Sequence, residues 1–168
     1  MDNNTIDIRN HEHMSVVAER IKDDEGKKNI PYQLEYKGNM KNKVKEDFYT
    51  VGYGHRIYGK PKEFYSNDEI ESLFEQDFQK AKDGAYRLTK DFTLKPEAFG
   101  VLTEMVYQMG EAKVATFKKT LNYLKEGNYK EAGLEVLRGN SAGTVSNWSL
   151  QTPKRADRAS KLLISLSE

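Results

Sequence analysis

The chain has 168 residues, enough for one domain that buries about two-thirds of the surface exposed by its unfolded form. Its 27 lysines and arginines almost balance its 26 aspartates and glutamates, which argues against a dedicated nucleic-acid-binding protein because such proteins are usually distinctly basic. It contains no cysteine, which excludes disulfides and thiol chemistry, and no apolar run approaches the length of a membrane span. We therefore expect neither a nucleic-acid partner nor a membrane anchor.

The N-terminal segment is polar and carries no pattern of a signal peptide. His11 and His13 lie in it, and a disordered terminus is the preferred interpretation over a metal site. From Met14 onward apolar residues recur at helical spacing. The sequence therefore predicts a flexible tail over residues 1–13 and a single domain over residues 14–168.

Glu25 lies at the end of this first predicted helix, immediately before the stop signal Gly26. The helix end carries partial negative charge, and Asp23 and Asp24 add two more carboxylates beside it. Both effects favour the protonated form of the Glu25 carboxyl, which is the form that a general acid needs. A solvated run of surface charges is the alternative interpretation of the same three acids.

A hairpin is predicted next, from Ile30 to about Tyr53, with a basic tip over residues 41–45. Its return strand runs into Thr50-Val51-Gly52-Tyr53-Gly54-His55, where closely spaced glycines indicate tight turns.

Five helices are predicted after the hairpin. The first begins at a capping box formed by Ser66 and Glu69 and carries Asp77 on its apolar face, where a carboxylate needs a partner. The others are a helix opened by Pro96, one over 114–125, one over 129–138, and a last one that starts at Thr152-Pro153, with Thr152 as its N-cap.

Five segments of the chain form one ordered pattern. They are Glu25-Gly26, Tyr32, Thr50-Val51-Gly52-Tyr53-Gly54-His55, Val106-Tyr107-Gln108-Met109-Gly110-Glu111 and Trp148-Ser149-Leu150-Gln151-Thr152-Pro153-Lys154-Arg155-Ala156. In this order they resemble phage lysozymes of the T-even type, and the resemblance extends roughly from Met14 to Leu166. It implies a lysozyme-like α+β fold, mainly α-helical, with a small hairpin lobe over about residues 27–65, a larger helical lobe, and a cleft between them.

The resemblance also implies an activity. Enzymes of this family hydrolyse the β-1,4 bond between N-acetylmuramic acid and N-acetylglucosamine in peptidoglycan, with inversion at the anomeric carbon and without a metal or cofactor. We therefore expect a monomeric endolysin that waits in the cytoplasm of a host bacterium and reaches the cell wall after a holin has permeabilised the membrane.

The catalytic groups that the resemblance implies are the general acid Glu25 and Thr50, which holds the attacking water together with a second carboxylate. The family places that second carboxylate, an aspartate, two residues after the tyrosine that matches Tyr32, where this chain has Leu34. Glu35 follows one residue later, and a one-residue bulge would turn it toward the cleft. We therefore predict Glu35 as the second carboxylate.

The return strand carries two other candidates for the second carboxylate just before Thr50, Glu46 and Asp47. The alternative interpretation of these two residues is that they are solvated surface charges. Among supporting residues, the resemblance implies that His55 pairs with Asp77 and that Arg155 forms an ion pair with Glu25. The positions that match sugar contacts in the family are Arg56, Tyr107, Thr120 and Glu135.

Two other functions stay open on the sequence alone. A lytic transglycosylase needs only an acid such as Glu25 and releases an anhydro sugar. A lysozyme-like module that binds peptidoglycan without turnover is the second, because the family's aspartate is replaced.

Overall fold

The computed structural model describes residues 11–37, 43–45, 47–138 and 147–167. The chain divides into two compact units. Residues 18–79 form one, called here the sheet unit, and residues 1–17 with 80–168 form the other, called here the helical unit. Within the described residues, no helix combines the length and the apolarity that crossing a membrane requires.

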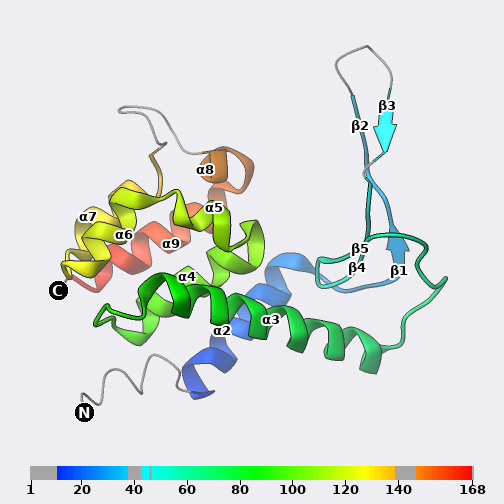
Figure 1. The fold of residues 1–168 in the computed structure, drawn as a ribbon, viewed down its shortest axis with the longest axis horizontal. Coiled ribbons are helices and arrows are strands. Elements are labelled where there is room, and N and C mark those ends of the chain that lie inside the picture. Colours follow the sequence, from blue (N-terminus) through cyan, green and yellow to red (C-terminus); the bar gives the residue numbers. More distant parts are fainter. Residues whose placement is uncertain (1–10, 38–42, 46, 139–146, 168) are drawn as a thin grey trace. The chain divides into compact units, whose positions relative to one another are not determined.

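The sheet unit contains the strands and parts of two long helices (Figure 1). Its elements are the end of α2 (His11–Glu25), β1 (Lys28–Tyr32), β2 (Glu35–Lys37), β3 (Lys43–Lys45), β4 (Tyr49–Gly52), β5 (His55–Ile57) and the first part of α3 (Asn67–Thr89). Because α2 begins at His11, the last three residues of the predicted tail are helical.

The predicted hairpin is divided into two small antiparallel sheets. One has the strand order β1-β4-β5, and the other pairs β2 with β3 and projects beyond it (Figure 1). The division falls at Gln33 and Leu34, which belong to no strand, and Leu34 exposes 56% of its surface. The pairing of β1 with β4 changes register between Lys28 and Tyr32, before the site at which we placed a bulge.

The core of the sheet unit forms where α3 packs against β4 and the end of α2. Its members are all buried and apolar: Ile21, Val51, Ile70, Phe74 and Phe78. Strand β4 lies close to α3 at Gly52, because a Cβ on this glycine would be 3.1 Å from Cγ2 of Ile70. The strand end that carries the predicted site is therefore held directly on α3.

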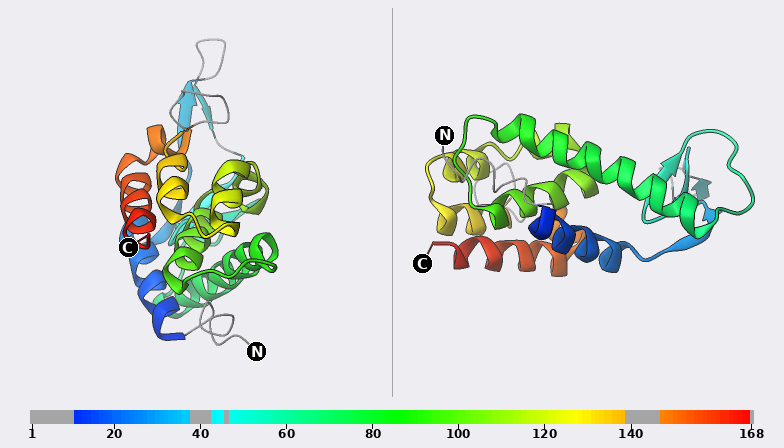
Figure 2. Two further views of the ribbon diagram at one scale, coloured as in Figure 1. Left: turned by 90° about the vertical axis from the view of Figure 1, so that its left-hand side faces the viewer. Right: turned by 90° about the horizontal axis from the view of Figure 1, so that it is seen from below.

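Among its described residues, the helical unit contains six further helices together with the first part of α2 and the last part of α3 (Figure 2). They are α4 (Pro96–Met109), α5 (Glu111–Ala115), α6 (Lys118–Lys125), α7 (Tyr129–Glu135), α8 (Asn147–Gln151) and α9 (Pro153–Ser165). Helix α9 lies against α7 and α4 (Figure 2). The absence of a side chain at Gly133 brings α7 close to α9, since a Cβ there would lie 2.7 Å from the carbonyl oxygen of Ser160.

The helix predicted over 114–125 is two helices, α5 and α6. At the break, the amide and the hydroxyl of Thr116 both donate to the carbonyl of Lys113, over 3.0 and 2.6 Å. The amide of Phe117 donates to Val114 in the same short pattern. Such bonds tighten and end a helix, so α5 stops before the next turn.

The start of α9 differs from the prediction in its chemistry. Pro153 opens the helix as expected, but Thr152 makes no capping bond to it. Its hydroxyl donates instead to the carbonyl of Trp148 over 3.0 Å and accepts a hydrogen bond from the Gln108 amide over 3.1 Å. A tertiary partner has therefore replaced the local cap.

Candidate active site

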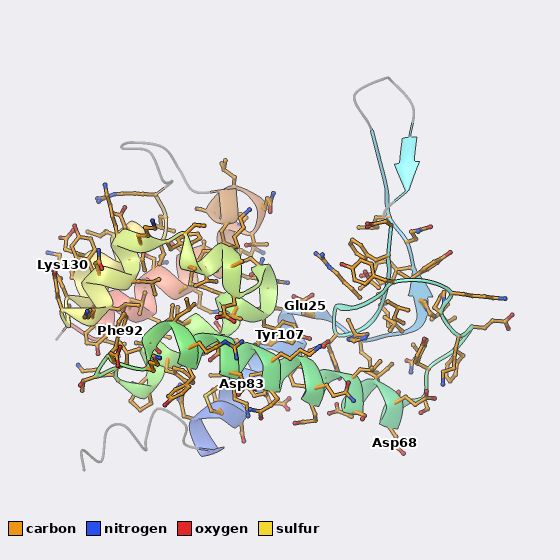
Figure 3. The ribbon with its side chains drawn as sticks, in the orientation of Figure 1. Glu25, Asp68, Asp83, Phe92, Tyr107 and Lys130 are labelled. Carbon is orange, nitrogen blue, oxygen red and sulfur yellow. The ribbon has the colours of Figure 1, made fainter. Side chains whose placement is uncertain are left out.

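Glu25 occupies the last position of α2, where Figure 3 shows its side chain at the end of the helix. The helix ends there because Gly26 adopts a positive φ of 71°, while its amide donates to the carbonyl of Lys22 over 2.9 Å. A left-handed residue after the last turn is a common way to end a helix, and glycine is favoured at it. The predicted stop signal is confirmed.

The carboxyl group of Glu25 lies against the turn that joins β4 to β5. Gly54 in this turn has a φ of 82°, and a Cβ on it would be 2.9 Å from Oε2 and 3.3 Å from Cδ of Glu25. A side chain at position 54 would therefore collide with the carboxyl group. The glycine spacing of the Thr50–His55 segment thus leaves room for the acid.

Thr50 lies in the middle of a row that crosses all three strands. Its Cα partners are Tyr32 on β1 and Arg56 on β5. Directly paired residues of antiparallel strands point to the same face of a sheet. Thr50 is therefore flanked on its face by an aromatic ring and a guanidinium group, two side chains suited to a sugar and its polar substituents.

His55 and Asp77 tie β5 to α3. Nδ1 of the imidazole is 2.7 Å from Oδ2 of the aspartate, and the two side chains are only 23% and 22% exposed. The need of Asp77 for a partner on an apolar face is thus met. The pair anchors the end of the β4–β5 turn, one residue from Gly54.

Lys22 holds the last turn of α2 in place, and sequence reasoning missed it. Its Nζ lies 2.9 Å from both carboxylate oxygens of Glu71 on α3, and 4.8 and 5.5 Å from the ring centroids of Phe74 and Tyr53. Burial alone lowers the pKa of Lys22, but the hydrogen bond and charge of Glu71 outweigh it, so the pKa is raised. The only indication of this role in the sequence is that a lysine precedes Glu25 by about one helical turn.

In the helical unit, Gln108 joins two of the motifs found in the sequence. The Trp148 indole donates to its Oε1 over 2.9 Å, and its Nε2 donates to the Thr152 hydroxyl over 3.1 Å. Tyr107, the neighbouring predicted sugar contact, is half-buried on α4 (Figure 3). Arg155 is half-buried on α9, and its pairing with Glu25 stays a prediction.

Two further predicted sugar contacts, Thr120 and Glu135, line one pocket of the helical unit with a volume of about 630 Å³. Both are buried, at 1% and 8% exposure. Glu135 pairs with Arg138, whose Nη1 lies 3.2 Å from Oε2 of the glutamate.

Comparisons with known proteins point to one family. The model of the family described as phage lysozyme matches residues 22–157. The chain belongs to the phage lysozyme family. It is 30% identical to a probable T4-type lysozyme 2 of Dictyostelium discoideum, over 86% of this chain and 91% of that protein. It is 33% identical to the endolysin of Bacillus phage B103, over 58% of this chain but only 37% of that protein's length.

A second Dictyostelium discoideum protein, probable T4-type lysozyme 1, is 26% identical over the same shares of the two chains, 86% and 91%. The chain is thus a glycoside hydrolase of the lysozyme type with a lysozyme-like α+β fold, and its substrate class is peptidoglycan.

The second carboxylate of this lysozyme stays a prediction. The backbone of Glu35 lies in β2 opposite Lys45, with regular pairing, but its side chain is outside what the structure describes. Glu46 also falls outside the described residues, and Asp47 is exposed.

Proposed function

We propose that this lysozyme cleaves the β-1,4 bond between N-acetylmuramic acid and N-acetylglucosamine, with Glu25 as the general acid. The observation that supports this role most is the close approach of the Glu25 carboxyl group to the backbone of Gly54. Glycoside hydrolysis requires an acid positioned at the leaving oxygen. The backbone of the turn defines one side of the Glu25 position, and the Lys22 contacts secure the helix that carries it.

The attacking water is proposed to be held by Thr50 together with Glu35, and the reaction to invert the anomeric carbon. An inverting enzyme needs its two carboxyl groups about 6.5–9.5 Å apart, with a water between them. The test compares Glu35→Gln with Glu46→Gln and Asp47→Asn. Glu35→Gln should cost far more turnover than the other two, and an equal or smaller loss would move the role to one of the rivals.

Substrate contacts are proposed on both units. On the sheet unit, Arg56 lies in the row with Thr50 and Tyr32. On the helical unit, Tyr107 and the pocket with Thr120 and Glu135 are the proposed contacts.

We further propose an endolysin role in which the monomeric enzyme accumulates in the bacterial cytoplasm and depends on a holin pore. Expression alone should leave cells intact until the inner membrane is permeabilised. Prompt lysis without permeabilisation would contradict this role, but it would not contradict the proposed hydrolysis of the glycosidic bond.

The activity itself is tested by the fall in turbidity of chloroform-permeabilised Gram-negative cells. Glu25→Gln keeps the size of the side chain but removes its proton, and general acids usually contribute about a hundredfold or more. Glu75→Gln is the matched control, because Glu75 lies exposed on α3 in the same unit. We expect near-complete loss in the first variant and none in the second. Substantial lysis by Glu25→Gln would overturn the assignment.

A further inference from the structure

A second row of side chains lies beside the row that contains Thr50, on the same face of the three-stranded sheet. In the antiparallel pairing of β4 with β5, Thr50 lies opposite Arg56. The same register, continued by two residues, brings Phe48 opposite Tyr58, and their rings are in contact. Residues two apart on a strand point to the same face and are separated by about 7 Å. The two rings therefore extend the Thr50 row along the strands.

The Phe48 ring contacts both the Tyr58 ring and the Arg56 guanidinium. The two ring centroids are 5.7 Å apart at an interplanar angle of 54°, and Cζ of Arg56 lies 4.3 Å from the centroid of Phe48. A guanidinium at this distance is attracted to the negative face of the ring. Phe48 thus holds the other two groups in place, and the three residues are called here the aromatic platform.

The two outer members of the aromatic platform face solvent. Tyr58 exposes 66% of its surface and Arg56 is also exposed, whereas Phe48 is half-buried. Among the described residues, no acid forms an ion pair with Arg56, so its donors are available to a ligand. A single exposed ring needs no explanation. Here, however, an exposed ring and an exposed guanidinium are ordered side by side without adding to the core, which indicates a binding surface.

We propose that the aromatic platform binds one N-acetylhexosamine unit of the glycan strand, next to the unit bound at Thr50. In a β-1,4-linked hexosamine chain the large ring substituents are equatorial, so the faces of each sugar present C–H groups with a slight positive charge. Such a face stacks on an aromatic ring, whose own face is negative. The planar guanidinium of Arg56 donates from its edge to the acetamido carbonyl. This inference rests on the proposed peptidoglycan substrate and adds Phe48 and Tyr58 to its contacts.

The test measures binding in the Glu25→Gln background, so that turnover does not enter the result. Calorimetry uses a peptidoglycan fragment of three disaccharide units that keeps its peptides. Tyr58→Leu preserves apolar bulk but removes the ring, and it should weaken binding about tenfold. Tyr58→Phe preserves the ring and should bind within about twofold of the parent. Because Tyr58 is mostly exposed, both variants should keep the melting temperature of the parent.

Phe64→Leu is the matched control, because Phe64 is an aromatic residue of the same unit with 59% exposure and lies outside both rows. It should bind the fragment as tightly as the parent does. Unchanged binding by Tyr58→Leu would overturn the proposal, and so would an equal loss in Tyr58→Phe or in Phe64→Leu. Analytical ultracentrifugation adds a further outcome: self-association of the parent that Tyr58→Leu abolishes would assign the aromatic platform to a second copy of the chain.

The same measurements separate this inference from the proposed function. A parent protein that binds the fragment but is indifferent to the ring at position 58 refutes the aromatic platform alone. A parent protein that does not bind the fragment refutes the proposed substrate, and the aromatic platform with it.

Discussion

Replacement of Gly54 by alanine tests whether the β4–β5 turn positions the Glu25 carboxyl group. The new Cβ would be 2.9 Å from Oε2, whereas ordinary contacts begin at 3.4 Å. The carboxyl group must therefore retreat by about 0.5 Å or more, the difference between those two distances. Because it is the flexible end of a side chain, this movement should cost little stability.

The substitution has two effects, a backbone cost and a displacement of the carboxyl group, and a control variant separates them. The positive φ of 82° imposes a backbone cost of roughly 1–2 kcal/mol on alanine. Gly59 provides the matched control, because its φ is 103° and a Cβ there would meet nothing within 4 Å. Both variants should therefore lose similar stability, with melting temperatures lower by roughly 2–4 °C for each kcal/mol.

Only Gly54→Ala should lose catalysis. A displacement of about 1 Å in a reacting group can cost on the order of a hundredfold, so we expect kcat to fall about ten- to a hundredfold. Steady-state rates on purified peptidoglycan, with thermal melts of both variants, measure the two effects. If Gly54→Ala keeps the rate of Gly59→Ala at equal stability, the turn does not position the acid.

Three further outcomes are expected. Asp77→Asn should lower the unfolding free energy by about 2 kcal/mol in urea titrations, because it weakens a charged hydrogen bond to His55, and an unchanged midpoint would contradict this. Lys22→Met should destabilise the fold at neutral pH. Since the folded-state pKa of Lys22 is raised, that stability is present below about pH 10.4 and is lost as the pH rises through the folded-state value, so the two proteins should converge at high pH. Arg155→Met should move the alkaline limb of the pH–activity profile upward if the ion pair with Glu25 implied by the family exists, and an unmoved limb counts against it.

Local signals in the sequence predicted the ends of several elements correctly. Gly26 ends α2, and the capping box at the start of α3 is present, with Ser66 Oγ 3.1 Å from the amide of Glu69. These features depend on residues within one helical turn of each other, so the local sequence is sufficient to predict them. The place of Asp77 on an apolar face likewise indicated that it needs a partner, but the partner itself, His55, lies 22 positions away and was implied only by the resemblance to the family.

Features that depend on distant residues were not predictable in this way. Lys22 and Glu71 are 49 positions apart, and neither carries a local motif. Thr152 has the right neighbours for an N-cap, but Gln108, which is 44 positions away, donates a hydrogen bond to its hydroxyl, and only the packed helical unit reveals this contact. The division of the hairpin at Leu34 likewise follows from how strands pair in space, not from strand propensity.

The most direct test of the account is mass spectrometry of the products released from purified peptidoglycan. We predict fragments that end in reducing N-acetylmuramic acid from the wild-type enzyme, and none from a Glu25→Gln protein with an unchanged melting temperature. Fragments that end in anhydro-muramic acid would instead show a lytic transglycosylase, and reducing fragments from a folded Glu25→Gln protein would show that Glu25 is not the acid.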